Sequence, residues 1–245
     1  MAGRRLRPVA LLLLATLLAG AAPLSPGLLP GVGPDDARRV VAADAAPWTA
    51  LARLQVAGVV RCTAVVVAPD RVLTAAHCLY DHRMRRFVAA DRVHVLARYA
   101  GGRYAAHVLG ASWRILPGYD PARPDATRAA DAALVILAAP LGAPALALAA
   151  TPAAGAATML GGYNQDRVEV IEADTGCRIT AVGALLAHDC AATRGTSGAP
   201  LLVRDAAGGW RIAGIQTGAY AGRNGGVAVP AAALQALLAT PESGR

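Results

Sequence analysis

The sequence predicts an all-β protein made of two antiparallel halves and closed by one helix. Short apolar runs alternate with turn residues from Trp48 onward, as in a many-stranded sandwich or barrel. A stretch dominated by Ala, Pro and Leu over residues 138–157 interrupts this pattern, and short runs then resume. Pro230 opens a final apolar segment in the first-turn position that a helix tolerates.

The predicted elements follow from these runs in chain order. In the first half, strands are expected over residues 51–60, 63–68, 93–98, 104–109 and 133–138. In the second half, strands are expected over residues 158–160, 167–172, 178–182, 184–187, 200–203, 210–216 and 226–229. The terminal helix is expected over residues 230–239.

The first 22 residues have the pattern of a secretory signal peptide. Arg4, Arg5 and Arg7 precede an apolar run over residues 9–18 and a small-residue stretch over residues 19–22. The run is shorter than the roughly 20 residues that span a bilayer, so a retained signal anchor is the weaker alternative. We therefore expect a secreted or periplasmic protein with no membrane span once the signal is removed.

Residues 23–39 are rich in Pro and Gly and end in Arg38-Arg39. This composition predicts a propeptide or flexible leader outside the core. The folded domain is then expected over residues 40–245.

The formal net charge is +8, and removal of the three leader arginines lowers it to +5. Every basic residue is Arg, yet no run of Arg exceeds two residues and aromatic residues seldom lie between them. The pattern favours a solvated basic surface, and we expect no nucleic-acid partner.

Four cysteines in an exported chain favour disulfides over a metal site. Cys62 and Cys78 flank one apolar strand pattern, and Cys177 and Cys190 flank another. Pairing of neighbours is the simplest of the three connectivities that four cysteines allow. The short spacings of a zinc site are absent, so no metal is expected.

Two distant segments predict nucleophilic catalysis, the one around His77 and the one around Ser197. A serine hydroxyl needs a base during attack, and an imidazole, oriented by a carboxylate, is suited to that task. Asp131 is the preferred carboxylate because it directly precedes a buried strand pattern, with Asp189 as its rival. Gly195 can place its N–H beside that of Ser197 as a pair of oxyanion donors.

Three ordered segments resemble the chymotrypsin/trypsin-like serine peptidases: 74–78 (TAAHC), 131–135 (DAALV) and 195–200 (GTSGAP). Within this family, the motif sequences are most similar to those of secreted bacterial trypsin-like and glutamyl peptidases. The resemblance implies two six-stranded antiparallel β-barrels, over about 40–140 and 150–229. It further implies endopeptidase activity on polypeptides through His77, Asp131 and Ser197, no cofactor, and a Cys62–Cys78 disulfide.

Departures from the family pattern concern activation and specificity. The bond Arg39–Val40 resembles the family's activation site, but Thr196 replaces the acid that pairs with the new N-terminus. Ala191 stands where trypsin-type enzymes hold an acid, and Gln216 where glutamyl peptidases hold a histidine. The expected pocket, lined by Ala191, Gln216, Thr217, Gly218 and Ala219, therefore suits an uncharged side chain.

A function from another class is a secreted binding protein on a catalytically weak or inactive peptidase scaffold, with an Arg-rich surface. Fold alone does not prove activity. The presence of all three catalytic residue types favours the enzyme, and we expect it to be a monomer.

Overall fold

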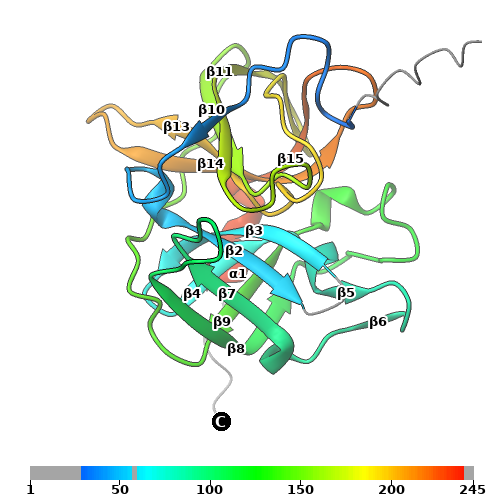
Figure 1. Cartoon of the computed structure of the whole chain (residues 1–245). Coiled ribbons are helices and arrows are strands. Elements are labelled where there is room, and N and C mark those ends of the chain that lie inside the picture. The colour runs from blue at the N-terminus through cyan, green and yellow to red at the C-terminus, as the bar shows by residue number, and fades with distance from the viewer. Residues whose placement is uncertain (1–28, 57–59, 240–245) are drawn as a thin grey trace, which may run out of the picture.

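The computed structural model describes residues 29–56 and 60–239, so the expected signal peptide lies outside the described residues. Two β-barrels stand one above the other in Figure 1, with the terminal helix at the seam between them. The prediction of two six-stranded antiparallel barrels with a C-terminal helix is confirmed.

The first barrel is closed, in the strand order β2-β3-β4-β9-β8-β7. Its strands are β2 (Leu51–Val56), β3 (Val60–Ala68), β4 (Arg71–Thr74), β7 (Val93–Ala97), β8 (Ala106–Ile115) and β9 (Ala133–Leu137). A small hairpin of β5 (Tyr80–Asp81) and β6 (Arg86–Phe87) and short 3-10 helices, including η2 (Ala76–Leu79) and η4 (Arg128–Ala130), connect these strands.

The second barrel follows the order β11-β10-β13-β14-β15-β12 and closes through pairing of β11 with β12. Its strands are β10 (Ala157–Gly162), β11 (Ile171–Val182), β12 (Leu186–His188), β13 (Pro200–Arg204), β14 (Trp210–Ala219) and β15 (Gly226–Pro230). The additional strand β1 (Arg39–Val41) pairs with β11 outside this closed set. The helix α1 (Ala231–Ala239) contacts β14 and β15 of this barrel and β9 of the other.

Strand β9 is apolar at all five of its positions because both of its faces are buried. Ala133, Val135 and Leu137 belong to the core of the first barrel, because side chains alternate along a strand. Leu134 and Ile136 point the other way and join a cluster that includes residues of the second barrel and α1. Both faces of β9 are thus buried, one inside the barrel and one at the seam.

Several element boundaries differ from the sequence predictions. Strand β4 was not predicted, β8 continues to Ile115, and β11 is one strand where two were predicted. Residues 167–170 form turns rather than a strand, with the N–H of Arg167 donating to the carbonyl of Asn164 at 3.1 Å. The strand predicted over residues 51–60 ends at Val56, and its remaining part falls largely on residues 57–59, which lie outside the described residues.

The segment before β1 packs against the second barrel, which differs from the expected flexible leader outside the core. The N–H of Gly31 donates to the carbonyl of Tyr220 at 2.6 Å, and the carbonyl of Gly31 accepts from the N–H of Ala192 at 3.0 Å. Val32 is 6% exposed. Gly31 has a φ of +78°, and a Cβ there would lie 2.0 Å from the carbonyl oxygen of Ala192, so the close approach requires glycine.

A buried guanidinium anchors the end of this segment. Arg38 is 6% exposed and forms ion pairs with Asp36 at 2.8 Å, Asp166 at 2.9 Å and Glu172 at 3.3 Å. These carboxylates raise the pKa of Arg38 above its usual range, against the effect of burial. The contacts with Asp166 and Glu172 hold residues 36–38 against the second barrel.

Two disulfides join the cysteines that are neighbours in the sequence. Cys62 bonds to Cys78 and Cys177 bonds to Cys190, as the simplest connectivity predicts. In the part of the chain that the structure describes, no helix is long and apolar enough to cross a membrane.

Candidate active site

His77 and Asp131 are brought together by the pairing of β4 with β9. Thr74 lies opposite Ala133 in this register, so the segments that follow β4 and precede β9 meet at one end of the barrel. The ring Nδ1 of His77 lies 2.7 Å from Oδ2 of Asp131. The backbone N–H of His77 donates to Oδ1 of the same carboxylate at 2.9 Å.

Burial makes this pair suited to orient a base. Asp131 is 2% exposed, and both of its carboxylate oxygens accept hydrogen bonds from His77. An ionised carboxylate accepts and does not donate, so Nδ1 must carry a proton and the other ring nitrogen, Nε2, is left as the acceptor. The His77 side chain keeps 27% of its surface exposed, which leaves the ring open to a substrate.

Ser197 belongs to the loop between β12 and β13, and contacts from the first barrel fix that loop. The N–H of Thr63 donates to the carbonyl of Ser197 at 2.9 Å, and Oγ1 of Thr63 donates to the carbonyl of Gly195 at 3.0 Å. The carbonyl oxygen of Ser197 also lies 3.8 Å from Sγ of Cys78, the residue after His77. The serine and histidine segments are therefore neighbours across the seam.

Gly198 makes this approach possible. Its φ is +85°, and a Cβ at this position would lie 2.1 Å from the Thr63 carbonyl and 2.2 Å from Oγ1 of Thr74. A side chain would therefore push the serine loop away from the strands that lead to His77. Among the described residues, the Ser197 hydroxyl forms no hydrogen bond with the His77 ring, and such bonds are often long before a substrate binds.

The geometry of Gly195 fits the expected oxyanion donors. Gly195 has a φ of +92°, and a Cβ there would lie 2.1 Å from the carbonyl oxygen of Tyr163. Within the described ranges, the N–H groups of Gly195 and Ser197 donate to no backbone acceptor, whereas those of Thr196 and Gly198 do. Two free donors on either side of a bonded one can converge on a single oxygen.

Asp189, the rival carboxylate, occupies a different environment. Its side chain is exposed, and Oδ1 accepts a hydrogen bond from the N–H of Arg178 at 2.6 Å. The His77 ring thus pairs with Asp131, the acid that the sequence favoured.

Of the residues expected to line the substrate pocket, residues 216–219 belong to β14, and Ala191 belongs to the loop between β12 and β13. Ala191 is 1% exposed and donates its N–H to Oδ2 of Asp174 at 2.9 Å. Thr217 accepts a hydrogen bond at its carbonyl from Nη1 of Arg128 at 3.1 Å, and the same guanidinium lies over Gly218. Ala219 is exposed and lies beside Gly31. Arg128 and Gly31 therefore lie against the expected pocket residues, which the sequence analysis did not predict.

Gln216 is paired with a buried histidine that the sequence did not connect with it. Oε1 of Gln216 lies 2.7 Å from Nε2 of His188, and Nδ1 of His188 accepts from the N–H of Cys190 at 3.2 Å. Nε2 of His188 therefore carries the proton and donates to Gln216. Burial lowers the pKa of His188 to about 4, so both side chains are neutral at pH 7.

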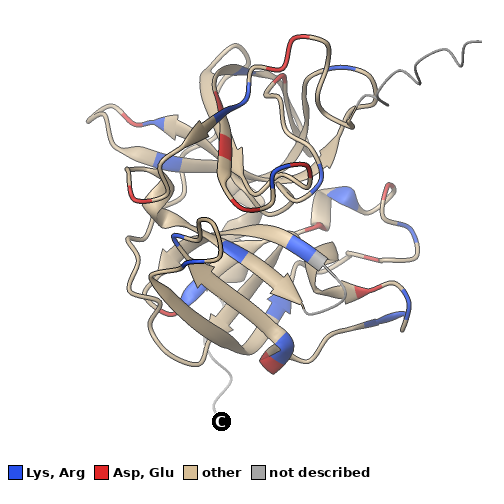
Figure 2. Ribbon diagram, viewed as in Figure 1, with Lys and Arg blue, Asp and Glu red and all other residues tan. Residues whose placement is uncertain are grey.

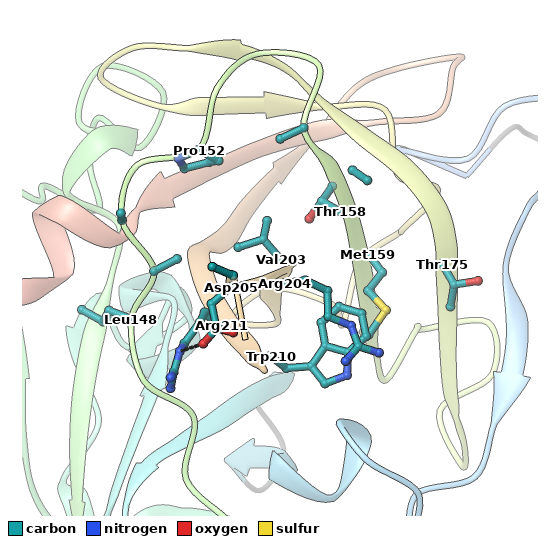
Figure 3. A pocket seen from close by; sticks show the side chains of 15 residues that line it. Leu148, Pro152, Thr158, Met159, Thr175, Val203, Arg204, Asp205, Trp210 and Arg211 are labelled. Carbon is teal, nitrogen blue, oxygen red and sulfur yellow. Dashed lines mark hydrogen bonds and ion pairs between the residues drawn. The ribbon is translucent and has the colours of Figure 1, made fainter. Parts of the chain in front are cut away.

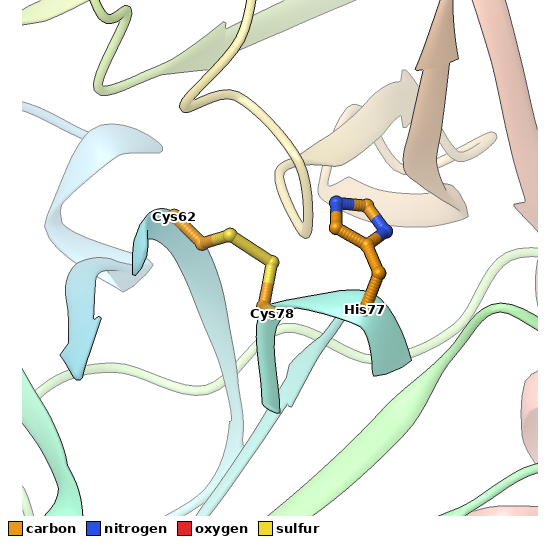
Figure 4. A group of neighbouring side chains, drawn as sticks. All are labelled: Cys62, His77 and Cys78. Atoms are coloured by element: carbon orange, nitrogen blue, oxygen red, sulfur yellow. A yellow bond between two sulfur atoms is a disulfide. The ribbon is translucent and has the colours of Figure 1, made fainter. Parts of the chain in front are cut away.

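Cys62, His77 and Cys78 lie close enough to suggest a metal site, but the sulfurs are bonded to each other. Figure 4 shows His77 beside this disulfide, on the segment that also carries Cys78. A disulfide offers no thiolate to a metal ion. Cys177, Asp189 and Cys190 form a second such group with the same chemistry.

A cavity of about 670 Å³ lies elsewhere on the second barrel (Figure 3). It is lined by residues of the 148–157 connection, of β10 and of the β13–β14 hairpin, including Trp210 beneath the guanidinium of Arg204. Leu148 bridges to Ile212, which holds the connection against the barrel. None of His77, Asp131 and Ser197 lines this cavity.

Sequence reasoning missed Thr63, Arg128 and the partnership of His188 with Gln216. Thr63 is fully buried, and its position directly after Cys62 was the only local signal. Arg128 lies three residues before Asp131, so its proximity to the site could have been suspected from spacing alone. The histidine and glutamine are 28 residues apart and carry no shared motif.

Comparison with known proteins identifies the family. Residues 62–215 match the trypsin-like peptidase domain, and the chain belongs to this family. The protein is accordingly a peptidase of the trypsin-like class, with polypeptides as its substrates.

Solved structures share the fold. A Glu endopeptidase in complex with MPD is 22% identical with a TM-score of 0.70, covering 83% of this chain and 96% of that chain. The protease Anisep from Arthrobacter nicotinovorans is 15% identical with a TM-score of 0.63, covering 83% of this chain and 100% of that chain. Among curated proteins, none matches this chain by sequence.

Proposed function

We propose that this protein is a secreted serine endopeptidase that hydrolyses peptide bonds through His77, Asp131 and Ser197. The observation that carries the proposal is the buried carboxylate of Asp131, 2.7 Å from Nδ1 of His77, beside a serine loop held by the first barrel. The two disulfides agree with an oxidising, extracellular location.

The proposed reaction gives each of these groups a role. Oγ of Ser197 attacks the substrate carbonyl while Nε2 of His77 takes its proton, and Asp131 stabilises the imidazolium that forms. The N–H groups of Gly195 and Ser197 donate to the oxyanion, and loss of one such donor slows turnover by roughly 100-fold to 1,000-fold. His77 then protonates the amine nitrogen as the peptide C–N bond breaks, which leaves the acyl-enzyme. Water next attacks the ester carbonyl while His77 takes its proton, and His77 returns that proton to Oγ of Ser197 as the acid product leaves.

For the side chain before the scissile bond we propose an uncharged residue. Gln216 and His188 are both neutral at pH 7, so these two side chains offer no charge to Arg, Lys or Glu. The guanidinium of Arg128, which lies over Gly218, is already paired with the carboxylate of Asp125. The carboxylate of Asp174 contacts Ala191 of the expected pocket, but it is already bound by the N–H groups of Ala191 and Gly176. A peptide library dominated by cleavage after Arg or Lys would overturn the uncharged preference and point to Asp174 instead.

The catalytic assignment is tested by a fluorophosphonate probe and by casein hydrolysis. Wild type should be labelled and active, and Ser197→Ala should lose both properties. Ser112→Ala, an exposed serine of β8, is the matched control and should behave as wild type. An active Ser197→Ala variant would refute the nucleophile assignment.

If correctly oxidised wild type neither reacts nor hydrolyses, the binding-protein alternative becomes the better account. No observation here favours it, because basic residues are scattered over both barrels and interleaved with acidic ones in Figure 2.

A further inference from the structure

A cavity of about 250 Å³ opens at the seam of the two barrels, beside the expected oxyanion donor. Three arginines line it together with Gly195: Arg53 from β2, Arg61 from β3 and Arg194 from the serine loop. Its volume is below the roughly 300–1,000 Å³ of pockets for drug-sized ligands. The cavity therefore suits one amino-acid side chain or a chain terminus.

The charge in this cavity is not balanced by the protein. Arg53 pairs with Glu169 at 3.3 Å, and the other oxygen of Glu169 accepts from the hydroxyl of Tyr99 at 2.5 Å. Within the described residues, Arg61 and Arg194 form no ion pair. Of the three arginines that line the cavity, Arg53 therefore has a carboxylate partner, and none of the residues that line the cavity is acidic.

Arg53 is held in a fixed orientation at the cavity wall. Its side chain is 5% exposed, it donates from Nη1 to the carbonyl of Val168 at 3.1 Å, and its guanidinium stacks 4.2 Å above the ring of Tyr99. Its Nε is buried and donates to no acceptor among the described residues. A buried donor without an acceptor is costly, so the stacking on Tyr99 and the bonds from Nη1 hold Arg53 in this orientation against that cost.

Two observations favour the leaving-group side of the proposed reaction centre as the place of this cavity. The residues expected to hold the acyl side are Ala191 and those of β14, and none of them lines this cavity. The leaving amine must receive its proton from His77, which is followed by Cys78. Cys78 is bonded to Cys62, and Arg61 directly precedes Cys62. The Cys62–Cys78 disulfide therefore connects the segment of His77 with the segment of Arg61, one of the three arginines of the cavity.

We propose that the cavity of Arg53, Arg61 and Arg194 binds a carboxylate of the substrate on the leaving-group side of the scissile bond. This inference rests on the proposed serine-peptidase function. Guanidinium groups pair with carboxylates through parallel hydrogen bonds, which makes three of them a selective site for that anion. Because an extended residue spans about 3.3–3.6 Å, the first or second residue after the cleaved bond reaches the cavity beside Gly195.

Two sources can supply this carboxylate: the side chain of Asp or Glu, or the free C-terminus of a substrate that ends there. Matched fluorogenic peptides distinguish them. One pair carries Glu or Gln at the first residue after the scissile bond, a second pair carries them at the second residue, and a third pair ends two residues after the bond with a free acid or an amide.

We expect wild type to cleave the preferred acidic member of at least one pair about 10-fold to 100-fold faster in kcat/KM, the range for a charge-assisted hydrogen bond. In Arg61→Gln and Arg194→Gln this ratio should fall toward one. Arg83→Gln, which removes an exposed arginine outside the cavity, should keep the wild-type ratio. The preference should also shrink as salt is raised, because Arg61 and Arg194 are exposed.

Equal cleavage of both members of every pair would overturn the carboxylate site while leaving the peptidase assignment intact. A preference that survives in both arginine variants would also overturn it. Fluorophosphonate labelling is run on each variant, so that a misfolded protein is recognised by lost labelling. If wild type is neither labelled nor active on any peptide, the proposed function fails together with this site.

Discussion

Replacement of Asp131 by Asn is expected to lower kcat by about 10,000-fold while leaving the fold intact. In the structure the two carboxylate oxygens have separate partners: Oδ1 accepts from the backbone N–H of His77 at 2.9 Å, and Oδ2 faces Nδ1 of the ring at 2.7 Å. An asparagine of the same shape keeps only one acceptor and gains two N–H donors.

The backbone decides which way this asparagine turns. The N–H of His77 is a donor that cannot change, so the amide oxygen stays opposite it and the amide NH2 faces Nδ1. The ring must then present Nδ1 as an acceptor, which moves its proton to Nε2 and leaves no base for Ser197. A 10,000-fold loss corresponds to about 5 kcal/mol of transition-state stabilisation at 1.36 kcal/mol per tenfold.

The assay compares kcat and kcat/KM on one fluorogenic peptide, together with the rate of fluorophosphonate labelling. Asp189→Asn is the matched control, because this exposed acid accepts a hydrogen bond from the N–H of Arg178 and does not contact His77. The activity of this variant should fall by less than twofold. A urea unfolding curve for Asp131→Asn excludes a global defect. A loss of less than 10-fold in Asp131→Asn, or a larger loss in Asp189→Asn, would refute the assignment of the orienting acid.

Three further predictions concern the N-terminal segment and the buried ionisable groups. Arg39→Gln should remove a cleavage site for trypsin-like enzymes yet keep wild-type fluorophosphonate labelling, because β1 is already paired with β11; an unlabelled variant would show that cleavage is required. Arg38→Gln should lower the free energy of unfolding by about 3 kcal/mol in urea, since it removes a buried partner of the Glu172 carboxylate, and a change below about 1 kcal/mol would contradict this. Burial lowers the pKa of His188 from 6.5 to about 4, so the unfolded chain binds a proton that the native state does not. The free energy of unfolding of wild type should therefore fall by up to about 3 kcal/mol as the pH is lowered from 6.5 to 4. The urea midpoint of His188→Gln should fall less over the same pH range.

Elements with a strong local pattern could be predicted from the sequence. The run over β9 is apolar at each of its five positions, and α1 follows a proline in its expected place, so both were located within one residue. Strand β4 was missed because its four residues follow closely on β3 and carry no pattern of their own. In β11 the break between the strands predicted over residues 167–172 and 178–182 includes Asp174, Thr175 and Gly176, whereas the observed strand continues through them.

Contacts between distant segments could not be read from local pattern. The leader seemed flexible because it is rich in Pro and Gly, yet Arg38 finds two of its acids 128 and 134 residues later in the chain. Similarly, the neutral character of the Gln216 wall depends on His188, whose burial only the closed barrel produces. A short motif predicts which residues carry the chemistry, whereas the charge of their surroundings depends on tertiary packing.

Thr63 explains why the proposed site needs both barrels at once. Its N–H and hydroxyl donate to the carbonyls of Ser197 and Gly195, and its own Oγ1 and carbonyl accept from Tyr163 N–H and Thr74 Oγ1. One buried residue of the first barrel thereby fixes the carbonyls of Ser197 and Gly195, on the strand pair that also leads to His77. Because a displacement of about 1 Å can cost roughly 100-fold in rate, the alignment of serine and histidine depends on this seam rather than on either barrel alone.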